Sequence, residues 1–279
     1  MNDLQNNRLV RAFAEARAAG RKMLVPFITG GYPDVDATLA LLWEFEARGV
    51  RVCEIGIPFS DPVADGPVIQ DSYTRTLADG RKLIDIEVIV DHYRAKGGKL
   101  AIAMMVSYSI AFRHGLADFC RDAAQRGFDA LIVPDLPLEE AGELGPLASA
   151  NGLAHVLLVA PTTTPARRIE IARRSRGFLY YVSVAGITGQ RDCLPEAAIR
   201  GVAELRRHTD TPVCVGFGIS RPETVAQVCA VADGAIVGSA IVGRITQGLD
   251  AGTPRAKIVD QVGQFVSELL APLNGRPQA

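Results

Sequence analysis

The sequence of 279 residues lacks long hydrophobic runs. It contains no stretch of 18 uninterrupted apolar residues, which a membrane-spanning helix requires. The polar N-terminus, MNDLQNNRLVRAF, lacks the apolar core of a signal peptide. We therefore expect a protein that is neither exported nor membrane-spanning.

Paired cysteine motifs are also missing. There is no C-x-x-C pair, and an odd number of cysteines cannot all form disulfides within one chain. Unpaired cysteines are typical of a reducing cytoplasm, which is where we expect the protein to be found. The five are Cys53, Cys120, Cys193, Cys214 and Cys229.

The chain has no excess of charge of either sign. It contains 30 Lys and Arg against 31 Asp and Glu, for a formal net charge of -1. Nucleic acids and anionic membranes both favour a basic surface, so neither is expected as the main partner.

Short, mostly apolar runs alternate with segments of helical periodicity along the whole sequence. Runs that are apolar on both faces are typical of parallel strands covered by helices. Eight such units without a linker predict an α/β fold, a single (β/α)₈ TIM barrel domain over residues 1–279, with an added N-terminal helix at 4–19. The longest gap, 59–98, is expected to hold a long loop and more than one helix. The predicted strands are 23–29, 50–58, 99–108, 128–135, 153–161, 178–184, 211–218 and 233–240.

Several kinds of catalytic machinery are missing from these strands. None of the five lysines lies in the body or at the C-terminal end of a predicted strand, where a Schiff-base aldolase needs one. The four histidines show no paired spacing, which disfavours a zinc enzyme. No strand is followed by G-x-G-x-x-G, so a nicotinamide cofactor has no signature. We expect carboxylate acid–base chemistry without a metal or a bound cofactor.

Carboxylates in and after the second predicted strand are candidates for this chemistry. Glu54 interrupts the apolar run VRVCEIGIP, and a buried carboxylate is costly without a partner or a function. Asp61 and Asp65 follow in the loop FSDPVADGP. A structural ion pair for Glu54 and an Asx-turn for Asp65 are the competing interpretations.

The last two predicted strands end in glycine-rich turns that favour an anion. VGFGIS (215–220) is followed by SRPE (220–223), which predicts a capping box with Ser220 as N-cap and Glu223 at N3. In VGSAIV (237–242), Gly238 and Ser239 are predicted to begin a short helix in the same way. Backbone N–H groups at such turns and at helix N-termini bind phosphate, although tight turning without a ligand is the alternative. The polar segment 185–192 after the sixth strand reads as a lid, or as an ordinary surface loop.

The motifs together resemble those of the tryptophan synthase α-subunit family. The resemblance covers about residues 8 to 270. It is carried by PFITGGYPD (26–34), EIGIPFSDPVADGP (54–67), DLPLEE (135–140), YYVSVAGITG (180–189), GFGIS (216–220) and GSAIV (238–242).

The resemblance implies retro-aldol cleavage of indole-3-glycerol phosphate to indole and glyceraldehyde 3-phosphate. It makes Glu54 the acid–base residue, which serves protonation of indole C3 and deprotonation of the C3′ hydroxyl. It makes Asp65 the acceptor of the indole N–H, stabilising the positive charge that develops on the ring.

The same resemblance implies the substrate-binding positions. Thr188 matches a lid residue that meets Asp65 on closure. The indole pocket matches Phe27, Ile132, Leu158, Tyr180 and Phe217. The phosphate-binding positions match Gly189, Gly218, Gly238 and Ser239.

The resemblance also implies a partner, a β subunit that carries pyridoxal phosphate and forms an α2β2 complex with this chain. One segment departs from the family pattern of Tyr, any residue, Asn, Pro, because MVSYSIAF (105–112) has Ser109 and Ile110 at the last two positions. The alternatives are a standalone lyase that releases free indole, a catalytically silent regulatory paralogue, and another phosphosugar barrel such as an isomerase.

Overall fold

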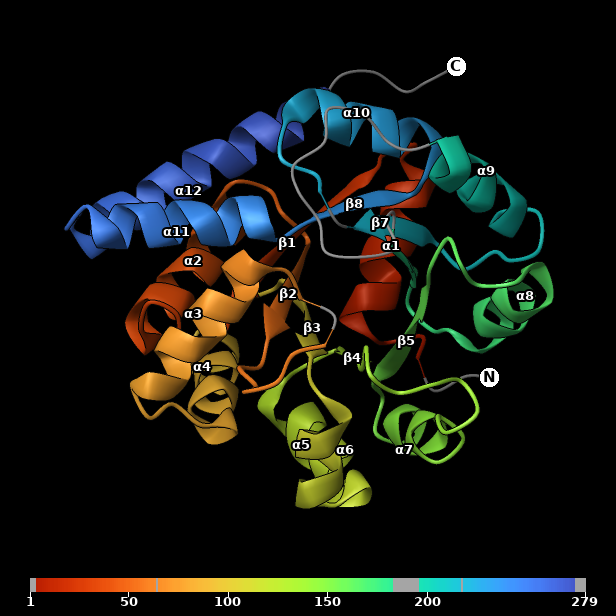
Figure 1. Ribbon diagram of the computed structural model, residues 1–279, viewed down its shortest axis with the longest axis horizontal. Helices are drawn as coiled ribbons and strands as arrows, with labels where there is room; N and C mark the ends of the chain where they lie inside the picture. The colour runs from red at the N-terminus through yellow and green to blue at the C-terminus, as the bar shows by residue number, and fades with distance from the viewer. Residues whose placement is uncertain (1–3, 64, 183–195, 217, 274–279) are drawn as a thin grey trace.

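Eight parallel strands close into a barrel in chain order, as the sequence predicts (Figure 1). The computed structural model describes residues 4–63, 65–182, 196–216 and 218–273. The last strand pairs with the first, which closes the sheet. The strands are β1 (Met23–Thr29), β2 (Val52–Gly56), β3 (Ala101–Met105), β4 (Ala130–Ile132), β5 (Ala154–Val159), β6 (Leu179–Val182), β7 (Val213–Gly216) and β8 (Gly234–Val237).

All eight predicted strands are present, but most are shorter than the apolar runs that predicted them. The run at 128–135, for example, contributes only the three residues of β4 to the ladder. Apolar residues just past a strand, such as Val133, are still buried without pairing. Hydrophobicity reports burial, and burial extends beyond the hydrogen-bonded part of each run.

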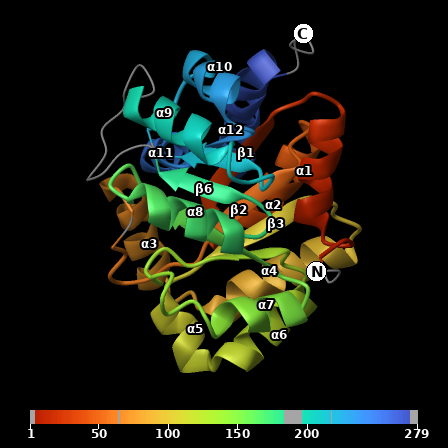
Figure 2. The same cartoon turned by 90° about the vertical axis from the view of Figure 1, so that its right-hand side faces the viewer.

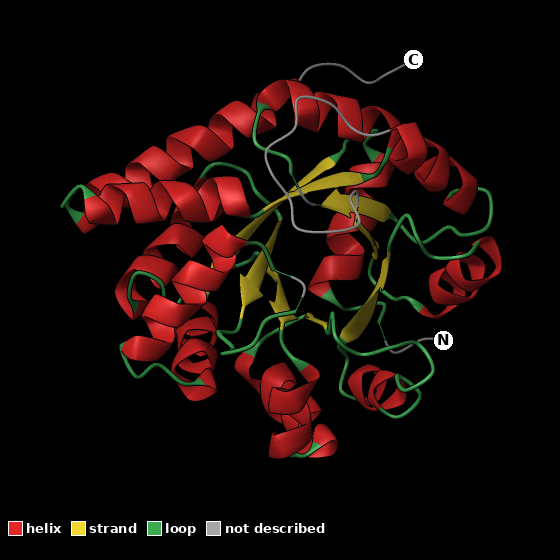
Figure 3. Cartoon of the chain, viewed as in Figure 1, coloured by secondary structure: helices red, strands yellow, loops and turns green. Residues whose placement is uncertain are grey.

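Helices surround the strands on all sides (Figure 3). The long gap after β2 holds α3 and α4, as predicted. The helices are α1 (Arg8–Ala18), α2 (Val35–Ala47), α3 (Pro67–Ala78), α4 (Leu83–Ala95), α5 (Tyr108–His114), α6 (Leu116–Arg126), α7 (Leu144–Ala150), α8 (Pro165–Arg174), α9 (Glu196–Leu205), α10 (Pro222–Val231), α11 (Ser239–Asp250) and α12 (Arg255–Leu270), followed by the short 3₁₀ helix η1 (Ala271–Leu273).

The added N-terminal helix lies at the N-terminal end of the barrel (Figure 2). It begins at Arg8 because the Asn7 side chain caps it, accepting hydrogen bonds from the N–H groups of the first turn. The Asn7 amide also donates to the backbone oxygens of Asp129 and Gly152 at 2.7 and 2.8 Å. These residues lie shortly before β4 and β5, so α1 is fixed to the end of the barrel opposite the carboxyl ends of the strands.

The expectations about membrane-spanning helices and disulfides can be compared with the fold. No helix among the described residues is long and apolar enough to cross a membrane. Cys53, Cys120, Cys214 and Cys229 are free, and Cys193 lies outside the described residues.

Candidate active site

Glu54 lies in the middle of β2 and is fully buried. Its register partners are Phe27 on β1 and Ala103 on β3. In the described part of the chain neither carboxyl oxygen has a hydrogen-bond partner, which argues against a structural ion pair. Burial, with a smaller contribution from Asp65, raises the pKa of Glu54 to about 8. Glu54 is therefore mostly protonated at neutral pH and can donate a proton.

Asp65 lies in the loop between β2 and α3, half-buried. The N-cap of α3 is Gly66, which has no side chain, so the Asp65 carboxylate is not the cap of this helix. The Gln70 amide donates to the backbone oxygen of Asp65 at 2.8 Å and holds the loop on the helix. Burial raises the pKa of Asp65 to about 6, which leaves it mostly ionised at neutral pH. The two carboxyl groups thus differ in protonation, as acid–base chemistry requires.

A cavity of about 270 Å³ lies beside these groups, toward the carboxyl ends of the strands. Functional sites of such barrels are found at this end. Glu54 is on the inner face of β2 below it. Six of the residues that the sequence predicts for the site line the cavity: Phe27, Asp65, Tyr180, Gly218, Gly238 and Ser239.

Two predicted indole-pocket residues do not line this cavity. Ile132 ends β4 and is the register partner of Met105, and Leu158 on β5 is the register partner of Tyr180. In each pair the longer side chain, Met105 or Tyr180, is the one that lines the cavity.

Three predicted positions cannot be compared with the structure. Thr188 and Gly189, with the rest of the proposed lid at 185–192, lie outside the described residues, and so does Phe217.

Several lining residues were not predicted, among them Met105, Ile69 and Ile236. Met105 ends β3, two positions after the register partner of Glu54, and Ile236 on β8 precedes Gly238 by two positions, so strand alternation alone places both on the inner face. Ile69 comes from the first turn of α3, and nothing in its local sequence separates it from an ordinary core residue.

The glycine-rich turns form one wall of the cavity. Gly218 has a φ of 78°, a conformation that side chains disfavour. Gly238 is the N-cap of α11 and supplies no side-chain cap, so the N–H groups that begin this helix, at Ser239 and Ala240, can face an anion. A Cβ on Gly238 would lie 3.3 Å from the Phe27 ring, so the absence of a side chain lets the turn approach β1 closely.

The predicted capping box after β7 is wrong. Helix α10 begins at Pro222, with Arg221 as N-cap and no side-chain cap. Proline is favoured at the first helical position because its φ is already helical and it needs no N–H partner there. Ser220 lies one residue before the cap and lines the cavity instead.

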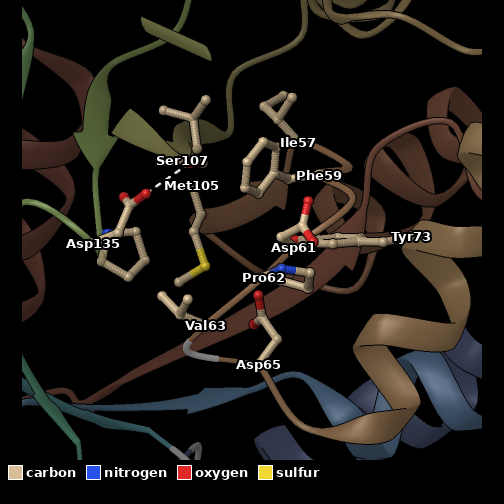
Figure 4. Close-up of a pocket in the computed structure, with 12 residues that line it drawn as sticks. Ile57, Phe59, Asp61, Pro62, Val63, Asp65, Tyr73, Met105, Ser107 and Asp135 are labelled. Carbon is tan, nitrogen blue, oxygen red and sulfur yellow. Dashed lines mark hydrogen bonds between the residues drawn. The ribbon is translucent and has the colours of Figure 1, made fainter. Parts of the chain in front are cut away.

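A smaller cavity of about 30 Å³ adjoins the first and shares Asp65 and Met105 with it (Figure 4). On its far wall the Ser107 hydroxyl donates to Asp135 at 2.7 Å. The Tyr108 N–H donates to the same carboxylate at 2.9 Å. These bonds join the loop after β4 to the start of α5.

Histidine and other metal-ligating side chains are not gathered together in the described part of the chain. No group of three or more His, Cys, Asp or Glu is placed to hold a metal ion in that part of the chain. His155 lies near the start of β5, paired in register with Leu131, and its ring lies on the helix side of the strand, where a Cβ built on Gly145 of α7 would be 3.4 Å from Nδ1. Burial lowers its pKa to about 4, so it is neutral.

The fold and the site agree with one protein family. The family model described as tryptophan synthase alpha chain matches residues 13–269. The chain belongs to this family. The tryptophan synthase alpha chain of Rhodopirellula baltica is 43% identical over 266 residues, covering 92% of this chain and 95% of that protein. The one from Prochlorococcus marinus is 45% identical over 260 residues, covering 92% of each.

Solved structures of the family have the same fold. The tryptophan synthase alpha chain of Legionella pneumophila gives a TM-score of 0.86 at 31% identity, covering 96% of this chain and 97% of that one. A chain from a structure of Mycobacterium tuberculosis tryptophan synthase gives 0.87 at 33% identity, covering 97% and 99%.

Proposed function

We propose that Glu54 and Asp65 are the catalytic pair of this tryptophan synthase alpha chain. The chain is a lyase, which cleaves indole-3-glycerol phosphate in tryptophan biosynthesis. The observation that carries the assignment is the buried Glu54 carboxyl, which has no hydrogen-bond partner among the described residues and lies on the barrel wall near a second carboxylate.

The two protonation states fit the order of proton transfers. Protonated Glu54 gives its proton to indole C3 and becomes a carboxylate. That carboxylate takes the proton of the C3′ hydroxyl, the bond between C3 and C3′ breaks, and its electrons neutralise the ring. Ionised Asp65 accepts a hydrogen bond from the indole N–H and stabilises the cationic ring while it exists.

The substrate phosphate is proposed to bind at the glycine-rich wall, where Gly218, Gly238 and Ser239 adjoin the N-terminus of α11. A helix N-terminus supplies N–H donors and a favourable dipole to a dianion. Phe27 and Tyr180 then flank the indole. Ile132, Leu158 and Phe217 as further indole contacts, Gly189 as a phosphate contact and Thr188 as a lid residue stay predictions.

The partner is proposed from the likeness to the Mycobacterium tuberculosis tryptophan synthase structures. We expect a β subunit carrying pyridoxal phosphate to dock on this chain as an α2β2 complex. We further propose one barrel domain over residues 1–279 and a cytoplasmic location, in keeping with the free cysteines.

A standalone lyase that releases indole is the second candidate. It is favoured by Ser109 and Ile110, which depart from the family pattern in the first turn of α5. A silent regulatory paralogue is disfavoured because both carboxylates are present at the cavity.

The test is indole release from indole-3-glycerol phosphate by the purified chain, alone and with a tryptophan synthase β subunit added. Slow release that rises strongly with the β subunit supports the complex. Fast release without such a gain supports the standalone lyase. No release in either case would contradict the roles proposed for Glu54 and Asp65.

A further inference from the structure

Tyr73 is a buried tyrosine on α3 that the sequence patterns do not single out, and its hydroxyl reaches the inner face of β2. A Cβ built on Gly56 would lie 2.4 Å from the Tyr73 hydroxyl oxygen and 2.5 Å from the tip of the Phe27 ring. Gly56 thus leaves room for a hydroxyl and an aromatic ring at the top of this strand.

Gly56 follows Glu54 by two residues on β2, toward the carboxyl end of the strand. Residues two apart on a strand face the same side, about 6.6 Å apart along it. Glu54 and Gly56 therefore both face the interior, and the Tyr73 hydroxyl occupies the layer next to the catalytic carboxyl on the side of the cavity. Tyr73 also lines the smaller cavity with Asp65 (Figure 4).

Glu54 needs a hydrogen-bond donor at one stage of the reaction. Neither of its oxygens has a partner among the described residues. The lack of a partner costs little while Glu54 is protonated and neutral. After proton donation the carboxylate is a buried anion, and burying an anion without a hydrogen-bond donor costs free energy.

We propose that the Tyr73 hydroxyl donates a hydrogen bond to the Glu54 carboxylate between the two proton transfers and holds it for the second. The inference rests on the proposed function. The Glu54 O–H bond breaks as the C3–H bond forms, and it forms again as the C3′ O–H bond breaks. Tyr73 keeps its own proton throughout, so it is a positioning residue.

The groups around Glu54 suit a neutral donor. Burial, and then the nearby carboxylates, raise the pKa of Tyr73 well above its usual value, so the phenol stays protonated. Four other titratable groups interact electrostatically with Glu54, and they come from the same strand, the loop after it, β6 and β7. They are Cys53, Asp65, Tyr180 and Cys214.

The test is the pH profile of Tyr73→Phe, which keeps the ring and removes the donor. A donor to the carboxylate favours ionisation, so its loss raises the pKa of Glu54 and moves the basic limb of kcat to higher pH by about half a unit or more. We expect kcat near neutral pH to fall about tenfold and KM to change little.

A second variant moves the profile the other way. Site-specific 3-fluorotyrosine at position 73 is a stronger donor, and its basic limb should move to lower pH. Tyr93→Phe is the matched control, because Tyr93 is also buried but lies at the opposite end of the barrel. Its hydroxyl accepts a hydrogen bond from the Leu100 N–H at 3.1 Å. Tyr93→Phe should leave the pH profile unchanged.

The outcomes separate this inference from the proposed function. A wild-type protein that releases no indole overturns the proposed function. An active wild type whose basic limb stays in place in both position-73 variants overturns the role of Tyr73 alone. Thermal melting of each variant confirms that it is folded under the assay conditions.

Discussion

Phe27 and Glu54 are register partners on β1 and β2, so an aromatic ring and a carboxyl group stand side by side on the inner face of the barrel. The ring stands beside a carboxyl whose burial raises its pKa to about 8, and it also lines the cavity. One pairing therefore accounts for two properties of the site, a protonated acid at neutral pH and an apolar wall for a flat ring. Moving either residue by one position would turn its side chain to the helix layer.

Activity is expected to follow a bell-shaped pH profile. Asp65 must be ionised and loses activity as the pH falls below about 6. Glu54 must be protonated and loses activity as the pH rises above about 8. The measurement is kcat/KM for indole release between pH 5 and 10, which reports the free enzyme. A profile that is flat across this range would remove both carboxyl groups from the mechanism.

Asp65→Asn should keep substrate binding and lose most turnover. The amide cannot supply the charge that stabilises the cationic ring, so kcat should fall by about 10² to 10³. Steady-state kinetics checks this, with ligand binding measured separately. Asp61→Asn is the matched control, because Asp61 is an exposed residue of the same loop and should leave kcat within about twofold.

Glu54→Gln should abolish turnover and stabilise the fold at alkaline pH. Because the folded pKa of Glu54, about 8, lies above the unfolded value of 4.5, Glu54 contributes stability below pH 4.5 that is lost as the pH rises to 8. The neutral amide avoids this loss. Unfolding free energies of both proteins should be nearly equal near pH 4.5 and differ by a few kcal/mol, in favour of the variant, near pH 9. A wild type as stable as the variant at pH 9 would contradict the burial of an unpaired carboxylate.

The sequence predicts the barrel and Glu54 for the same physical reason. Strands covered on both sides are apolar throughout, so a charged residue inside such a run stands out. Side chains that enter the site from α3 give no such signal. Ile69 and Tyr73 have the spacing of ordinary helix core, and only the position of α3 in the fold brings them over the barrel. The wrong N-cap at Ser220 has a local cause, since Pro222 competes as the first helical residue and is the stronger signal.

Gly56→Ala should destabilise the protein and disturb the site. The added methyl would meet the Tyr73 hydroxyl and the Phe27 ring at 2.4 and 2.5 Å, well inside contact distance. Overpacking of this kind costs about 1 to 3 kcal/mol. Gly142→Ala is the control, because a Cβ there meets nothing within 4 Å. Chemical denaturation should show the loss in the first variant and less than about 0.5 kcal/mol in the second.

Ser239→Asp, at the start of α11, should weaken phosphate binding without lowering the stability of the protein. A carboxylate in the first turn of a helix interacts favourably with the helix dipole, so the melting temperature should hold or rise slightly. The same charge repels a phosphate dianion at the glycine-rich wall, so KM should rise tenfold or more while kcat changes less. Ser239→Ala isolates the loss of the hydroxyl and should raise KM only severalfold. If both variants bind indole-3-glycerol phosphate like the wild type, the phosphate lies elsewhere in the barrel mouth. A much larger KM increase in Ser239→Asp than in Ser239→Ala, with an unchanged Ki for indole itself, supports a phosphate site at the N-terminus of this helix.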